Sequence, residues 1–225
     1  MERLLKLAFI FDYMADHQLN APSREDLRGL GHDLVTLIDA LAAKDHLDIS
    51  ATLAPLQTAS RERKILEFLS QYAKTTRYYN LDALTLQQNV TDPLSVWNRL
   101  LSSIVDDEME PGKIALIQER AAEFAGVAGT FMGGIVHGLD QQQLSLEELV
   151  RLPQLQRWAA PRAIWSIYRI LNPMKTAMLK AFERVSIVDH QIAASTGKSS
   201  VPEMTEFLIW LWGERRDVLA KQRWP

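Results

Sequence analysis

The sequence predicts an all-α fold: a single helical-bundle domain of about eight helices over residues 1–225. Three observations predict it. Apolar residues recur at helical spacing along most of the chain, whereas strand-like alternation is nearly absent. Residues that start and stop helices stand between these stretches. The composition, 47% hydrophobic and 24% charged residues, is that of an ordinary globular protein with a core of normal size.

The first part of the chain predicts four helices. We expect them over residues 2–17, over 24–30, from His32-Asp33 onward, and from Ser60 to about Lys74. Ser23 and Ser60 are N-cap residues, and Gly31 can end the second helix in a left-handed conformation. Residues 48–58 are expected to be irregular. In the fourth helix the inward side chains are predicted to be Ile65, Leu66, Phe68, Leu69 and Tyr72.

The second part predicts further helices. Asp92-Pro93 is a helix start, because aspartate caps well and proline suits the first helical position. A long helix is expected over residues 113–139, and Ser145 with Glu148 forms a capping box for a short helix. Prolines then punctuate the chain before a helix over 174–194, and Pro202 starts the last helix over 203–221. The punctuating prolines are Pro153, Pro161 and Pro173.

Small residues line one face of the predicted helix 113–139. Ala122, Gly126, Gly129 and Gly133 are spaced by three or four positions and so share a face. Each glycine costs about 1 kcal/mol of helix propensity relative to alanine, so a compensating contact is expected. Close packing of another helix is the main expectation. A subunit interface and a slot for a small molecule are the alternatives.

Composition excludes several chemistries. The absence of cysteine excludes disulfides, cysteine-ligated zinc, iron–sulfur clusters and thiol catalysis. The carboxylate pairs Asp12/Asp16 and Glu119/Glu123 lack a Glu-x-x-His partner. We therefore expect no metal and no cofactor. The longest uncharged apolar stretch, residues 124–136, is too short to span a bilayer, and no targeting signal is apparent, so a cytoplasmic protein without membrane partners is expected.

Charge is unevenly distributed. Residues 151–225 carry 12 Lys and Arg against 6 Asp and Glu, whereas residues 1–150 carry 13 against 22. Such asymmetry is found where one end of a protein faces nucleic acid, and also where opposite surfaces pair within a fold or between subunits.

One segment combines cations and aromatic rings. Lys74, Arg77, Tyr78 and Tyr79 lie at the end of a predicted helix and in the following loop. Such side chains can stack a base and hold a phosphate, so they are candidate nucleic-acid-binding residues. The alternative is that both rings cap the core and Arg77 pairs with an acid.

Arg184 and His190 are the candidate catalytic pair. In RNA cleavage, histidine can move the proton of the 2′-hydroxyl while arginine stabilises charge on the phosphate. The two residues are six positions apart, so on an undistorted helix their side chains point about 120° apart. They can then share one site across a two-fold axis, or in one chain if the helix is bulged.

Two short segments carry a family resemblance. Leu4-Leu5-Lys6-Leu7 in the first helix and Gly31-His32-Asp33-Leu34-Val35-Thr36-Leu37 at a later helix start resemble the opening of HEPN domains. These higher-eukaryote and prokaryote nucleotide-binding domains are small helical bundles of bacterial defence and toxin systems. The resemblance implies an all-α, dimeric module and, for active members, a metal-independent endoribonuclease. The family signature is Arg, then four to six residues, then His, and Arg184 and His190 match that spacing.

The sequence leaves more than one function open. The first is a HEPN-like RNA-directed protein of bacterial defence or regulation, either an endoribonuclease or a degenerate relative. The second is a non-enzymatic, homodimeric interaction module with a protein partner, and a third is a small-molecule binder beside Gly129 and Gly133. A homodimer is expected from the glycine stripe and from the last helix, where Phe207, Leu208, Trp210, Leu211 and Trp212 form an apolar run.

Overall fold

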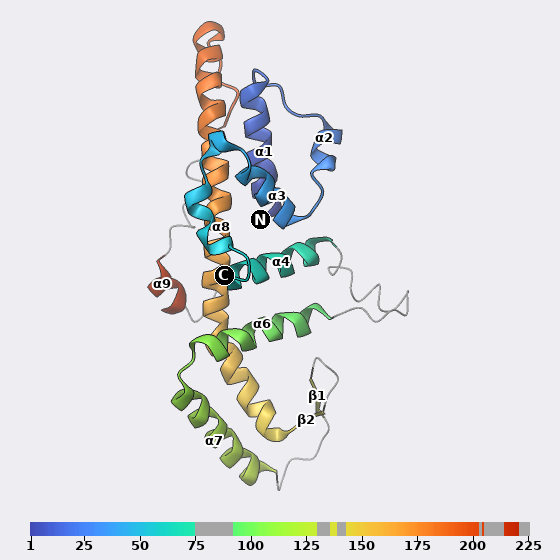
Figure 1. The fold of residues 1–225 in the computed structure, drawn as a ribbon, viewed down its shortest axis with the longest axis vertical. Coiled ribbons are helices and arrows are strands. Elements are labelled where there is room, and N and C mark those ends of the chain that lie inside the picture. Colours follow the sequence, from blue (N-terminus) through green and yellow to red (C-terminus); the bar gives the residue numbers. More distant parts are fainter. Residues whose placement is uncertain (75–91, 130–135, 139–142, 203, 205–213, 221–225) are drawn as a thin grey trace. The chain divides into compact units, whose positions relative to one another are not determined.

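The computed structural model describes residues 1–74, 92–129, 136–138, 143–202, 204 and 214–220 (Figure 1). Helices dominate these residues, which confirms the all-α prediction. The chain divides into two compact units, and each is made of two separate stretches of sequence. Unit 1 comprises Met1–Arg77 and Ser166–Glu214, and unit 2 comprises Tyr78–Trp165 and Arg215–Pro225. A single domain over residues 1–225 stays a prediction.

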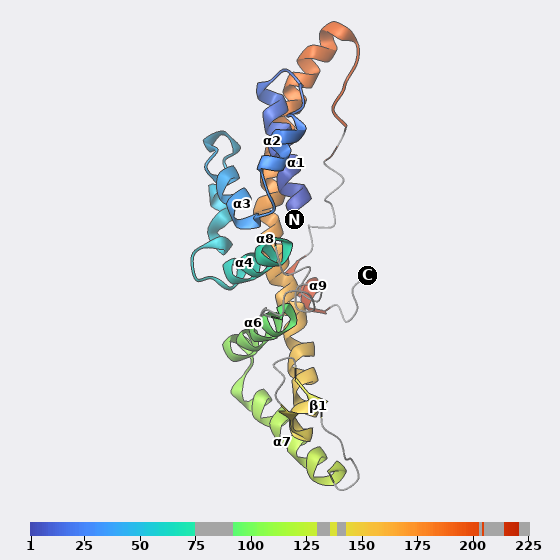
Figure 2. The same ribbon diagram turned by 90° about the vertical axis from the view of Figure 1, so that its right-hand side faces the viewer.

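Unit 1 is built from short helices and part of one long helix. Helices α1 (Glu2–Asp16), α2 (Arg24–Gly29), α3 (Leu34–Ala42) and α4 (Arg61–Lys74) come first in the chain. Two 3₁₀ helices, η1 (Asp45–Leu47) and η2 (Ser50–Leu56), lie between α3 and α4. The C-terminal half of α8 (Leu146–Thr196) runs beside α1 (Figures 1 and 2).

Local caps explain where these helices begin. The Ser23 hydroxyl accepts from the Asp26 amide at 3.1 Å, and the Asp26 carboxylate accepts from the Ser23 amide at 3.0 Å. This is a capping box, and Gly31 follows it with a φ of 63°, as predicted. The Asp33 carboxylate caps α3, and the Ser60 hydroxyl accepts from the Arg63 amide at the start of α4.

The core of unit 1 forms where α1, α3, α4 and α8 bury their apolar faces. Phe11 of α1 and Phe182 of α8 meet with ring centroids 5.6 Å apart. Two of the five predicted inward residues of α4 are fully buried, whereas Tyr72 is 45% exposed. The large, fully buried side chains of this unit are Leu5, Leu37, Ile38, Leu41, Leu47, Ile49, Ile65, Leu66, Ile170, Met174 and Met178.

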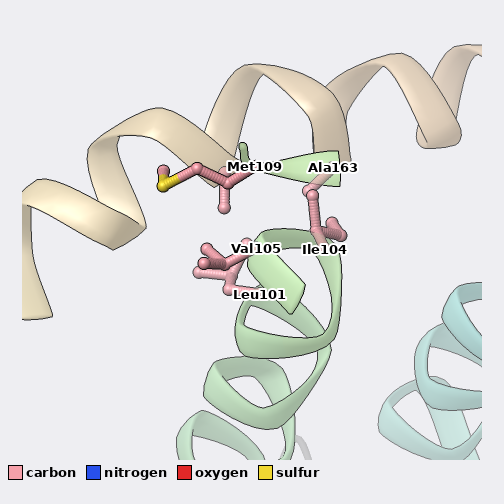
Figure 3. Close-up of a cluster of buried hydrophobic side chains, with 6 residues drawn as sticks. Leu101, Ile104, Val105, Met109 and Ala163 are labelled. Carbon is pink, nitrogen blue, oxygen red and sulfur yellow. The ribbon is translucent and has the colours of Figure 1, made fainter. Parts of the chain in front are cut away.

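Unit 2 has its own core. Its elements are α6 (Pro93–Glu108), α7 (Pro111–Ala128), the short antiparallel strands β1 (Val136–His137) and β2 (Gln143–Leu144), the N-terminal part of α8, and α9 (Arg215–Ala220). Asp92 accepts from the Leu94 amide at 2.9 Å, so α6 starts as predicted. The core between α6 and α8 consists of Leu101, Ile104, Val105, Met109, Ala159 and Ala163, and Figure 3 labels all of these except Ala159.

Helix α8 differs from the prediction. The capping box of Ser145 and Glu148 forms, but the helix then continues through all three prolines to Thr196 (Figure 2). A proline inside a helix costs about 3 kcal/mol, because it removes one backbone hydrogen bond and crowds the preceding turn. Tertiary burial outweighs this cost. The buried α8 residues flanking the prolines include Ala159, Ala163, Ile170, Met174, Ala177 and Met178.

The prediction of one helix over residues 113–139 is wrong, and the expected close packing of another helix on its small-residue face is not found among the described residues. A subunit interface at this face stays a prediction. The helix ends at Ala128, with Gly129 as its C-cap, and residues 136–137 form a strand. Ala122, Gly126 and Gly129 are exposed, and a methyl group added at Gly126 would meet no atom within 4 Å. These glycines therefore weaken the end of a surface helix. Gly133 and the apolar run 207–212 lie outside the described residues.

Candidate functional site

The site begins with a carboxylate on an apolar helix face. Asp12 lies on α1 among Leu5, Ala8 and Phe11, which are buried at helical spacing, and it is only 1% exposed itself. A charged carboxylate at such a position is costly unless other groups bond to it and balance its charge.

Three donors from distant parts of the chain converge on this carboxylate. Lys44 Nζ donates to Asp12 Oδ2 at 2.7 Å, and His46 Nε2 lies 2.7 Å from Oδ1. Arg184 of α8 donates to Asp12 Oδ1 and, at 2.7 Å, to Asp16 Oδ1. We call these five residues the Asp12 cluster.

The local backbone presents Lys44 and His46 together. Both precede a left-handed residue, Asp48, which has a φ of 44° at the C-cap of η1. Leu47 is fully buried, so it anchors this turn on the core of unit 1. Lys44 also lies 5.8 Å from the centroid of the Phe9 ring, which adds a cation–π contact from α1.

Asp12 stays ionised in this setting. Burial on its own raises the pKa of a carboxyl, but hydrogen bonds from Lys44 and His46 and the charges of Lys44 and Arg184 outweigh burial and lower the pKa of Asp12. The carboxylate is therefore a fixed acceptor that orients the donors around it.

The donors themselves reach the surface. The side chains of Lys44, His46 and Arg184 are 33%, 42% and 30% exposed, in contrast to Asp12. The carboxylate holds one nitrogen of the His46 ring, which leaves Nδ1 with no partner among the described residues. Two N–H groups of the Lys44 ammonium also have no hydrogen-bond partner among the described residues. A histidine backed by a buried aspartate and flanked by two cations can move a proton and stabilise an anion.

The predicted catalytic pair is divided between two places. Arg184 joins the Asp12 cluster, whereas the exposed His190 bonds through Nδ1 to the Ser186 carbonyl at 2.7 Å. Helix α8 is regular over both residues. Sequence reasoning missed His46. The one available signal was a charged residue, Asp12, on an otherwise apolar helix face.

The predicted nucleic-acid-binding residues are described only in part. Lys74 Nζ donates to Asp33 Oδ2 at 2.6 Å, beside Ser70, whose hydroxyl donates to Asp33 Oδ1. Lys74 thus supports the cap of α3. Arg77, Tyr78 and Tyr79 lie outside the described residues.

The carboxylate pairs do not gather into a metal centre. Asp12 and Asp16 are joined by Arg184, and Glu119 and Glu123 lie exposed on α7. Within the described ranges, no three His, Asp or Glu residues are grouped so that they can hold a metal ion.

The chain matches no protein-family model, no curated protein and no solved structure. Across the part of the chain that the structure describes, no helix has the length and apolar character needed to cross a membrane.

Low pH should destabilise the folded state, because it protonates carboxylates that accept hydrogen bonds there. The hydrogen bond from Lys74, followed by bonds from Thr36 and Ser70, lowers the pKa of Asp33 well below its usual value despite some desolvation. A lowered folded-state pKa contributes stability that is present above the unfolded pKa, near 4, and is lost as the pH falls through the folded pKa. We expect Asp33→Asn to flatten the fall in melting temperature between about pH 5 and pH 2.

Asp45→Asn is the matched control, because the Asp45 side chain has no hydrogen bond or ion pair among the residues described. If the melting temperature fell equally steeply with decreasing pH in Asp33→Asn and in the wild type, this assignment would be contradicted.

Proposed function

We propose that the chain is an RNA-directed protein and that the Asp12 cluster cleaves RNA. One observation carries the proposal: a partly exposed histidine, His46, is held by a buried aspartate between Lys44 and Arg184. The HEPN resemblance and the basic composition of residues 151–225, which include Arg184, agree with an RNA substrate.

The groups present suit attack by the ribose 2′-hydroxyl. His46 Nδ1 accepts the 2′-hydroxyl proton while the 2′-oxygen forms a bond to the adjacent phosphorus. The bond from phosphorus to the 5′-oxygen breaks, and that oxygen takes a proton from water. Lys44 and Arg184 stabilise the negative charge that develops on the phosphate oxygens, and His46 then returns its proton to solvent. The products are a 2′,3′-cyclic phosphate and a 5′-hydroxyl.

The roles of the cluster residues differ. Asp12 is a positioning residue, since it fixes the ring nitrogen that faces it and leaves the other for chemistry. Arg184 donates hydrogen bonds to Asp12 and Asp16, and these bonds fix the orientation of the guanidinium plane. Lys74, Arg77, Tyr78 and Tyr79 stay proposals for contacts to RNA outside this cluster.

The test is cleavage of single-stranded RNA in the presence of a chelator. We expect His46→Ala to lower the rate about 100-fold or more, the usual contribution of general acid–base catalysis. Arg184→Lys should also slow cleavage, because the charge is kept but the planar fork is lost. His32→Ala is the matched control, since His32 bonds to Glu2 away from the cluster.

Other outcomes are equally clear. An RNA with a single 2′-deoxyribose at the cleavage position should be resistant there, because the nucleophile is missing. Wild-type rates in His46→Ala would contradict the proposal. Loss of activity in His190→Ala with full activity in His46→Ala would instead favour the pairing of Arg184 with His190 across a two-fold axis.

A second function, a homodimeric interaction module, is favoured by the surface of α7. Leu116, Phe124 and Val127 are 43%, 48% and 71% exposed. Leu116 and Val127 lie eleven positions apart, close to three full turns, so they fall on one side of the helix. Exposed apolar side chains grouped in this way are typical of contact surfaces.

Sedimentation velocity tests this second function. If α7 joins two copies of the chain, Phe124→Ser with Val127→Ser should shift a dimer to a monomer that still unfolds cooperatively. Leu94→Ser on α6, at a position 58% exposed, is the control for removing an exposed apolar side chain. A wild-type protein that sediments as a monomer over the full concentration range would contradict this role.

A further inference from the structure

A cavity lined by both polar and apolar side chains lies within unit 2, whereas the residues of the Asp12 cluster all belong to unit 1. Its volume is about 470 Å³, which suits a small organic molecule. Residues of α6, β1, β2 and α8 line it.

One face of α6 and one face of α8 form the two long walls of the cavity. On α6 the lining residues are at 95, 98, 99 and 102, and on α8 they are at 149, 152, 153 and 156. Both sets follow the spacing of one helix face. A different face of α6, which includes Ile104, fills the core shown in Figure 3. The cavity therefore rests against a packed core.

Several hydrogen-bond donors that line the cavity have no protein acceptor among the described residues. Gln156 Nε2 donates to Asn98 Oδ1 at 3.1 Å, so both N–H groups of the Asn98 amide are left without a partner among the described residues. The same holds for the guanidinium of the exposed Arg99 and for the Ser102 hydroxyl. Glu148, an acidic lining residue, accepts through Oε2 from the amide and hydroxyl of Ser145, and its carboxylate also interacts electrostatically with Arg151.

A second cavity of about 210 Å³ adjoins the first, and the two share Asn98, Ser102, Leu152 and Gln156. Arg151 and Asp106 also line it. Arg151 Nε is buried without a hydrogen-bond partner among the described residues. A buried N–H without an acceptor is unfavourable, and a nearby negative charge reduces the cost of burying part of a guanidinium.

We propose that this cavity binds a small organic anion, a carboxylate or a phosphate ester with an apolar body. The anionic group is recognised by Arg99, Arg151 and the Asn98 amide, which supply charge and directed N–H donors. The apolar body lies along the leucine and proline side of the cavity, Leu144, Leu149, Leu152 and Pro153. The two arginines and the Asn98 amide favour an anionic group over a neutral one, and the apolar wall favours an organic molecule over a bare inorganic ion.

Isothermal titration of the full chain tests the proposal with four probes. Hexanoate and phenyl phosphate are the anions, and hexanamide and phenol are their neutral counterparts. We expect at least one anion to bind at least tenfold more tightly than its neutral counterpart. Comparison of the two anions identifies the preferred head group, carboxylate or phosphate.

Variants locate the binding. Arg151→Gln and Arg99→Gln should each weaken the preferred anion about tenfold or more, as expected for loss of a charge-assisted hydrogen bond. Arg157→Gln is the matched control, because Arg157 lies on the exposed side of α8 and does not line either cavity. Arg99 is exposed, so Arg99→Gln keeps the test valid even if Arg151→Gln fails to fold.

Three results would overturn the proposal. They are the absence of heat with both anions up to roughly 10 mM, equal binding of the neutral counterparts, and unchanged anion affinity in Arg99→Gln together with Arg151→Gln. The RNA-cleavage variants of the Asp12 cluster do not touch this cavity, so failure of either proposal is seen separately.

Discussion

Replacing Asp12 by alanine is expected to lower the free energy of unfolding by about 3 kcal/mol. Removing one partner of a buried ionic network typically costs about 3–5 kcal/mol, because the remaining charges keep their desolvation cost without the compensating bonds. The lower end applies here, since Lys44, His46 and Arg184 retain some contact with water. Urea unfolding followed by circular dichroism measures the change.

Asp16→Ala is the matched control for this variant. Asp16 accepts from the same arginine, Arg184, but its side chain is 51% exposed. Exposed ion pairs contribute at most about 1 kcal/mol, so Asp16→Ala should be far milder. Similar costs for both substitutions would mean that burial does not set the energetics of the cluster.

The second large effect is expected in unit 2. Ile104→Ala removes a fully buried side chain from the core between α6 and α8 (Figure 3). Replacing a large buried aliphatic residue by alanine costs about 2–5 kcal/mol through lost burial and the cavity left behind. Thermal unfolding should show this as a clearly lowered melting temperature.

Leu94→Ala provides the comparison on the same helix. Leu94 lies in the first turn of α6 and is 58% exposed, so its truncation leaves no buried cavity. We expect a change within about 0.5 kcal/mol. A cost as large as that of Ile104→Ala would show that the apolar face of α6 is not the one facing the core.

What could be predicted from the sequence was mostly local. Ser23, Asp92 and Ser145 act on backbone groups two or three residues away, so a short window of sequence contains the whole interaction. The α-helical class followed from periodicity in the same way. The strands at residues 136–137 and 143–144 were missed, because two residues are too few to show strand-like alternation.

The candidate site could not be predicted for the opposite reason. Asp12 and Arg184 are 172 positions apart, and nothing near either residue indicates the other. His46 lies in the short 3₁₀ helix η1, where local signals carry no information about α1. The continuation of α8 through Pro161 and Pro173 also depends on distant packing, which outweighs local preference.

The interleaved order of the two units has a consequence for synthesis. The residues of unit 1 are interrupted by Tyr78–Trp165, so its first stretch leaves the ribosome long before Ser166–Glu214. Until then α1, α3 and α4 lack the α8 residues that complete their core, and the apolar faces around Leu66 stay open to other contacts. Most of unit 2 emerges meanwhile as one continuous stretch. Nascent chains stopped near residue 165 should therefore depend on chaperones that cover apolar surface, and release of the full chain should end that dependence.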